Sequence, residues 1–121
     1  MIQSFKDLTA WKHSMRVAAE VYQVTSTFPS EEQFGIVNQL RRAAVSVSSN
    51  IAEGFGRNSR KEKDQFYAIA YGSLLEVESQ LILSVRLRFL PQDMAQSVLD
   101  VVAEAQKTLA GLQRANKARK E

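Results

Sequence analysis

Apolar residues recur every three or four positions along almost the whole chain, and this spacing constrains the fold more than any other feature. In the first segment the series is Leu8, Trp11, Met15, Ala18 and Tyr22. Such spacing places the apolar side chains on one face of an α-helix. No segment alternates apolar and polar residues over a useful length, as a half-buried β-strand would. The sequence therefore predicts an all-helical protein.

Prolines and glycines divide the chain into four such segments. Pro29 and Pro91, the only two prolines, fall between periodic segments, and Gly54 and Gly56 end the second one. The predicted helices cover residues 8–27, 31–54, 60–89 and 92–115, followed by a basic tail at 116–121. Residues suited to N-caps precede the first three helices: Asp7, Ser30 with Gln33 at capping-box spacing, and Ser59 with Glu62 at the same spacing.

The connections between these helices are only a few residues long, so consecutive helices must run antiparallel. A chain of 121 residues fits one domain with one core. The sequence therefore predicts a single domain over residues 1–121, an antiparallel up-down-up-down four-helix bundle. The third helix carries apolar residues on two faces, which indicates a central helix or an oligomer interface. We expect a homo-oligomer.

The residue types exclude most catalytic and metal chemistry. The chain has no cysteine, which excludes disulfides, thiolate metal sites and cysteine nucleophiles. The only histidine, His13, has no second metal ligand at helical spacing, so we interpret it as a packing or surface residue. The serines have no base beside them, and Gly54-Phe55-Gly56 lacks the strand and the lysine of a phosphate-binding loop. We expect no enzyme activity, no catalytic residue, no cofactor and no metal.

The N-terminal segment has no apolar core of signal-peptide type. No run of the sequence approaches the roughly 18 apolar residues that a membrane helix needs. We therefore expect a soluble cytoplasmic protein that has no contact with a membrane.

The segment from residue 39 to residue 57 combines helical apolar spacing with an unusual polar face. Arg42, Ser46, Asn50 and Glu53 follow one another at intervals of three and four. Serine and asparagine disfavour helix interiors because their side chains compete for backbone hydrogen bonds. Close packing against another helix would offset this cost.

The third helix offers a matching surface for that polar face. Gly72 and Ser73 are small enough to allow a close approach, and Glu76 lies one turn beyond Gly72. We predict that these residues form a structural polar seam between the two helices. In that seam Ser46, Asn50 and Glu53 should be partly buried, and Arg42 should pair with Glu53 or Glu76.

Residues at specific spacing along the chain carry a family resemblance. In the second helix they are Gln39, Arg42, Ala43, Ser46, Asn50-Ile51-Ala52-Glu53-Gly54 and Arg57. Elsewhere they are Leu8, Trp11 and Phe28-Pro29, and then Phe66, Ala70, Gly72-Ser73, Glu76 and Leu81. The chain thereby resembles the 23S-rRNA intervening-sequence proteins, a family of small bacterial four-helix bundles. The resemblance implies a homopentameric ring. It also implies similarity to accessory proteins of diversity-generating retroelements, which bind nucleic acid and a reverse transcriptase.

Basic residues gather in two clusters that an up-down-up-down bundle would bring to the same end. The joint between the second and third helices carries Arg57, Arg60, Lys61 and Lys63. The end of the fourth helix carries Arg114, Lys117, Arg119 and Lys120. A ring of such ends would form a positive rim that contacts RNA or DNA phosphates without reading sequence.

A second function stays open because the formal net charge is only +3. The chain could instead be a protein-interaction scaffold, or a module similar to the reverse-transcriptase accessory proteins, without direct nucleic-acid binding. The modest charge and the broad apolar surface of the third helix favour this alternative.

Overall fold

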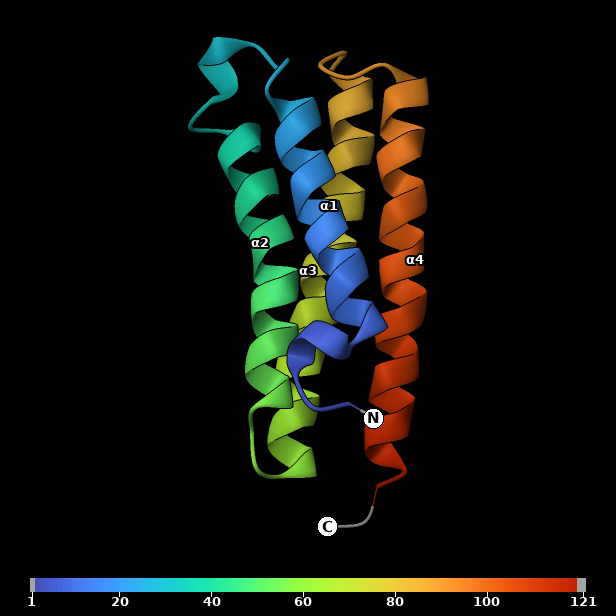
Figure 1. Ribbon diagram of the computed structural model, residues 1–121. Helices are drawn as coiled ribbons and strands as arrows, with labels where there is room; N and C mark the ends of the chain where they lie inside the picture. The colour runs from blue at the N-terminus through green and yellow to red at the C-terminus, as the bar shows by residue number, and fades with distance from the viewer. Residues whose placement is uncertain (1, 120–121) are drawn as a thin grey trace.

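A computed structural model describes residues 2–119 as an all-helical protein, which confirms the predicted fold class (Figure 1). Its four long helices are α1 (Thr9–Thr25), α2 (Ile36–Phe55), α3 (Arg60–Arg86) and α4 (Gln92–Lys117). Two short 3-10 helices, η1 (Phe5–Asp7) and η2 (Ser30–Glu32), precede α1 and α2. Residues 2–119 contain no β-strand.

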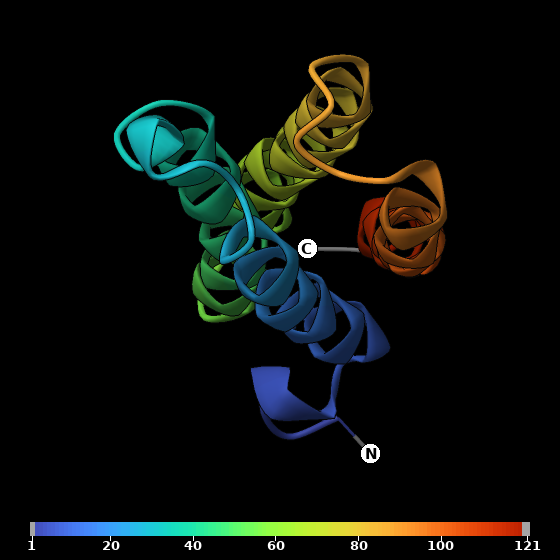
Figure 2. The same cartoon turned by 90° about the horizontal axis from the view of Figure 1, so that it is seen from above.

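The four helices lie side by side around one core. Helices α1 and α3 each contact both α2 and α4. Figure 1 shows the α1–α2 and α3–α4 connections at one end of the molecule, and the α2–α3 connection together with the end of α4 at the other. Seen from above in Figure 2, α2 and α4 lie on opposite sides of α1 and α3.

The core is built from the apolar stripe of each helix. Its largest fully buried side chains include Val17, Val21, Leu40, Val47, Ile51, Tyr67, Leu74, Val77, Leu81, Val98, Val102 and Leu109. Each such aliphatic side chain contributes about 1.5–3 kcal/mol when it leaves water. The apolar residues spaced by three and four, which indicate the fold in the sequence, thus also supply most of its stability when they are buried.

Helix α2 begins five residues later than the sequence predicts. Residues Ser30–Glu32 form the 3-10 helix η2, and the N-cap position of α2 is Gly35, with φ −104° and ψ −117°. The prediction that α2 starts at residue 31 behind a Ser30 cap is therefore wrong. Glycine tolerates backbone angles outside the helical region, so the chain can turn at Gly35 before the helix starts.

Among the other predicted helix ends, one cap is confirmed, while a second cap and the end of α3 are wrong. Ser59 caps α3 as predicted, since its Oγ accepts a hydrogen bond from the Glu62 N–H at 3.1 Å. Asp7 is not the N-cap of α1, because its carboxylate accepts hydrogen bonds from the Gln3 and Ser4 N–H groups. At the other end, α3 finishes at Arg86 and not at residue 89. Arg88, with φ 64°, turns the chain into the left-handed region there.

The outward face of α3 is unusually apolar. Five large side chains on it are each 45–52% exposed: Ile69, Leu75, Ile82, Leu83 and Leu87. By length and composition alone this helix could cross a membrane, which corrects the expectation that no segment approaches a membrane span. The core helix of a soluble bundle meets the same criterion, and the opposite face of α3 is fully buried in this bundle.

Candidate functional site

A polar seam joins α2 to α3 at the middle of the bundle. The Ser73 Oγ of α3 donates a hydrogen bond to the Ser46 Oγ of α2 at 2.9 Å. The Asn50 amide Nδ2 donates to the same Ser46 Oγ at 3.0 Å and to the Ser46 carbonyl at 2.8 Å. All three side chains are half-buried. Ser46 therefore satisfies Asn50 within its own helix and Ser73 across the interface.

The charged residues expected in the seam do not form the predicted pair. The side chain of Glu53 is 59% exposed and pairs with Arg57 one turn along the same helix, at 3.0 Å. The exposed Glu76 accepts a hydrogen bond from Gln80, also one turn along its own helix. Within residues 2–119, Arg42 has neither a hydrogen bond nor an ion pair. The prediction that Arg42 pairs with Glu53 or Glu76 is wrong because local partners at i, i+4 are closer.

Gly54 of α2 and Gly72 of α3 have opposite surroundings. A Cβ at Gly54 would lie 2.8 Å from Tyr67 Cε1 and 2.9 Å from Phe66 Cβ, so this glycine allows α2 to approach α3. A Cβ at Gly72 would have no atom within 4 Å, because Gly72 faces outward from α3. Gly72 therefore does not belong to the interface in which the sequence placed it.

The two basic clusters meet at one end of the bundle. Arg60 Nη1 donates to the Lys117 carbonyl at 3.0 Å, which ties the start of α3 to the end of α4. The buried Asn116 reinforces this contact, since its Nδ2 donates to the Arg60 carbonyl at 3.1 Å and to the Asp64 carboxylate. Figure 1 shows the α2–α3 connection and the end of α4 close to each other.

Three of the eight predicted nucleic-acid-binding residues have partners within the bundle. Lys63 is only 9% exposed, and its Nζ donates to the Phe55 carbonyl at the end of α2 at 2.6 Å. Arg60 bonds to the end of α4, and Arg57 pairs with Glu53 while its guanidinium lies 4.5 Å from the centre of the Phe66 ring. These cations help to stabilise helix ends, where the carbonyl groups carry partial negative charge.

Four other members of the two clusters are exposed, and they define what we call the basic pole: Lys61, Arg114, Lys117 and Arg119. The eighth residue, Lys120, lies outside the described residues. Burial lowers the pKa of Lys63, and the positive charge of Arg119 lowers it further. The charge of Arg119, beyond the end of α4, therefore acts on Lys63 in the first turn of α3.

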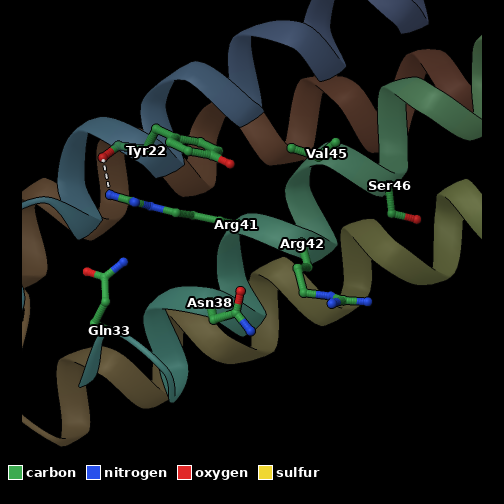
Figure 3. A pocket seen from close by; sticks show the side chains of 7 residues that line it. All are labelled: Tyr22, Gln33, Asn38, Arg41, Arg42, Val45 and Ser46. Carbon is green, nitrogen blue, oxygen red and sulfur yellow. Dashed lines mark hydrogen bonds between the residues drawn. The ribbon is translucent and has the colours of Figure 1, made fainter. Parts of the chain in front are cut away.

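A hollow of about 500 Å³ between α1 and α2 escaped the sequence reasoning (Figure 3). Arg41 extends along it, with Nε donating to Thr25 Oγ1 at 2.9 Å and Nη2 donating to the Tyr22 carbonyl at 3.3 Å. The guanidinium also lies 4.5 Å from the centre of the Tyr22 ring. The sequence offered no signal for this arrangement, because the facing positions of α1 and α2 are known only once the helices are paired.

The described part of the chain contains no group of three histidine, aspartate or glutamate side chains that could hold a metal ion. His13 lies 3.3 Å from Thr108 Oγ1, between α1 and α4. Its position fits the interpretation as a packing residue.

Comparisons with known proteins agree with this architecture. The sequence model of a family described as 23S rRNA-intervening sequence protein matches residues 6–111. A crystal structure from Bacteroides thetaiotaomicron, a protein with unknown function from the S23 ribosomal protein family, has a TM-score of 0.78 at 21% identity. The similarity covers 88% of this chain and 99% of that chain, and at this identity it supports the fold alone. No curated protein matches the sequence.

Proposed function

The chain belongs to the 23S rRNA-intervening sequence protein family, and from that premise we propose a non-enzymatic oligomer that binds RNA or DNA phosphates through its basic pole. The observation that carries the proposal is the contact between the start of α3 and the end of α4. Through Arg60 and Asn116 it holds the first turn of α3, which carries Lys61, against the end of α4, where Lys117 and the following Arg119 lie. Clustered cations release counterions from a phosphate backbone when they bind it, and they need no base contacts to do so.

Assembly would bring together the few positive charges that each basic pole carries. The proposed arrangement is an up-down-up-down bundle that self-associates through the apolar outer face of α3 into a ring in the cytoplasm. The number of five copies comes from the family resemblance alone. A cyclic ring would place every basic pole on the same side, so that a few charges per chain become a broad positive rim.

Binding of a structured RNA and of a random-sequence DNA duplex across a salt series tests the proposal. We expect affinity to fall steeply with salt and to differ little between sequences. Deleting the whole C-terminal end would also remove the Asn116 contact, so point substitutions are the sharper test. Lys117→Gln combined with Arg119→Gln should weaken binding to both nucleic acids and reduce the slope of log affinity against log salt by about 1–2.

Lys107→Gln is the matched control. Lys107 is an exposed cation of the same helix, about 15 Å from Lys117 along the helix axis. It should leave both the affinity and the salt slope unchanged. Absence of binding to either nucleic acid at low salt would rule out this function.

The second candidate function is a protein-interaction scaffold, similar to a reverse-transcriptase accessory module, without direct nucleic-acid binding. One observation favours it specifically: Arg57, Arg60 and Lys63 form contacts within the bundle and are less available to phosphates. A chain that assembles but shows no salt-dependent binding would support the scaffold.

A further inference from the structure

The α1/α2 hollow carries positive charge that no carboxylate in its lining offsets. Arg41 and Arg42 both line it, and no aspartate or glutamate does (Figure 3). Asn38, Arg41 and Arg42 stand at i, i+3 and i+4 on α2, so they lie within one turn on the same side of the helix. A guanidinium binds a carboxylate or a phosphate through two parallel hydrogen bonds, which makes such a pair a candidate site for an anionic group.

Arg41 is held in place before any partner binds. Its Nε and Nη2 donate to Thr25 Oγ1 and to the Tyr22 carbonyl, and its guanidinium lies over the Tyr22 ring. Thr25 is buried, and its hydroxyl donates to the Val21 carbonyl at 2.7 Å, which fixes the acceptor of Arg41. Nη1 of Arg41 has no partner within residues 2–119. A guanidinium that is already immobilised loses little side-chain entropy when it binds an anion.

Arg42 extends the site across α2 toward α3. It lines a second hollow of about 270 Å³ together with Ser46, Ser73 and Glu76, and Figure 3 shows it pointing away from Arg41. Arg42 and Ser46 line both hollows, so the two adjoin on the outer side of α2. Glu76 accepts its hydrogen bond from Gln80, at 3.1 Å. The α1 side of this surface is therefore positive, and the α3 side contains a negative group.

The lining side chains fit a segment of protein better than a strand of nucleic acid. In the part of the chain that the structure describes, the side-chain amides of Gln33 and Asn38 have no partner, and an amide both donates and accepts, as a peptide backbone does. Phosphate oxygens only accept, so a phosphate backbone would leave the amide oxygens unmatched and would be repelled by Glu76. Tyr22 and Val45, both more than 40% exposed, offer contacts to an apolar side chain of the partner.

We propose that the α1/α2 hollow binds an acidic segment of a partner protein, with a carboxylate of the segment on Arg41 and the following residues crossing α2 beside Arg42. Most residues that line the hollow are exposed, so a small molecule would stay largely in water, whereas a protein segment covers the whole surface. The hollow lies toward the α1–α2 connection, at the end of the bundle opposite the basic pole (Figure 1). The inference therefore goes beyond nucleic-acid binding and does not depend on it.

Because the chain has no cysteine, one cysteine placed at the hollow allows a segment to be captured reversibly. Asn38→Cys changes an exposed position one turn before the two arginines. The probe is a blocked peptide of aspartate, glutamate, phenylalanine and one cysteine, equilibrated with the full chain in a thiol–disulfide buffer and measured by intact mass. We expect it to occupy Asn38→Cys about tenfold more than a peptide in which asparagine and glutamine replace the acids, because hydrogen bonds to charged groups are the stronger ones.

Leu87→Cys is the matched control. It is an exposed position between the exposed Arg86 and Arg88, and it lines neither hollow. There the acidic peptide should gain only about twofold over the neutral one, since exposed charges interact weakly in water.

Substitutions added to Asn38→Cys assign the preference to the arginines. Arg41→Gln and, separately, Arg42→Gln should each reduce it toward the level of the Leu87→Cys control. Arg42 is exposed and has no partner within residues 2–119, so Arg42→Gln keeps the fold even if Arg41→Gln loosens the contact between α1 and α2. Lys117→Gln with Arg119→Gln, which tests the basic pole, should leave the preference unchanged.

Several results would overturn the inference. These are equal occupancy by the acidic and the neutral peptide at Asn38→Cys, an equal preference at Leu87→Cys, or a preference that survives both arginine substitutions. Stronger capture of a thiol-bearing uridine oligonucleotide would make the hollow a nucleic-acid contact, and a disulfide-linked dimer that excludes every peptide would show a second copy in it. None of these results affects the salt-dependent binding that tests the basic pole, so either proposal can fail alone.

Discussion

Gly54 shows how one residue sets the distance between two helices. An added methyl group would meet Tyr67 and Phe66 at under 3 Å, and Tyr67 is only 2% exposed and cannot move aside. We expect Gly54→Ala to destabilise the fold by about 1–3 kcal/mol, because overpacking outweighs the better helix propensity of alanine. Urea denaturation measures the change.

Gly111→Ala provides the control for that substitution. It also replaces a helical glycine, but the nearest atom to its Cβ would be an arginine nitrogen at 3.8 Å, an ordinary contact. It should stabilise the fold by about 0.5–1 kcal/mol through helix propensity. Equal effects from both substitutions would mean that Gly54 does not limit the approach of α2 to α3.

Charged partners were the least predictable feature at this scale. Spacing along a helix accounts for the pair of Glu53 with Arg57, which stand at i, i+4 in the same segment. It failed for Arg42, because a contact between helices depends on their rotation and on side-chain rotamers that the sequence leaves open. Arg41 is instead the anchored arginine, because Thr25 and Tyr22 of α1 face it.

At the scale of whole elements, the packing of the end of α4 against α3 depends on Asn116. This side chain is 3% exposed and bonds to both the backbone and a carboxylate of α3. We expect Asn116→Ala to cost about 1–3 kcal/mol, because buried polar groups of α3 lose their partner. Hydrogen exchange should show the last turn of α4 opening more often than in the wild type.

Asn50→Ala is the matched comparison for this element. The Asn50 amide bonds only within α2, to Ser46, so its loss leaves the helix interface intact. It should change stability by less than about 1 kcal/mol and leave exchange in α4 unchanged. Similar exchange in both variants would show that Asn116 does not hold α4 against α3.

Apolar periodicity predicted the four helices well. It failed at the helix ends, where backbone geometry and local capping determine the first and last residue. The start of α4 follows from Pro91, the N-cap residue, because a proline is tolerated at the start of a helix but not in its interior. The late start of α2 could not be predicted, because Ser30 and Gln33 have capping-box spacing but the chain forms the short helix η2 there. The end of α3 depends on the left-handed backbone conformation of Arg88, which an arginine in a sequence does not indicate.

At the scale of the whole molecule, the proposed self-association through the apolar outer face of α3 would make stability depend on protein concentration. A chain that folds and self-associates gains stability as its concentration rises, because assembly removes folded monomer by mass action. We expect the melting temperature of the wild type to rise by about 5–10 °C between about 1 and 100 µM. Light scattering at the same concentrations should report the assembled mass.

The variant with Glu76→Arg and Leu83→Arg is the control, and its melting temperature should stay constant throughout this range of concentration. A wild-type chain that behaves in the same way, and scatters as a 13.6 kDa particle, would contradict self-association and with it the positive rim.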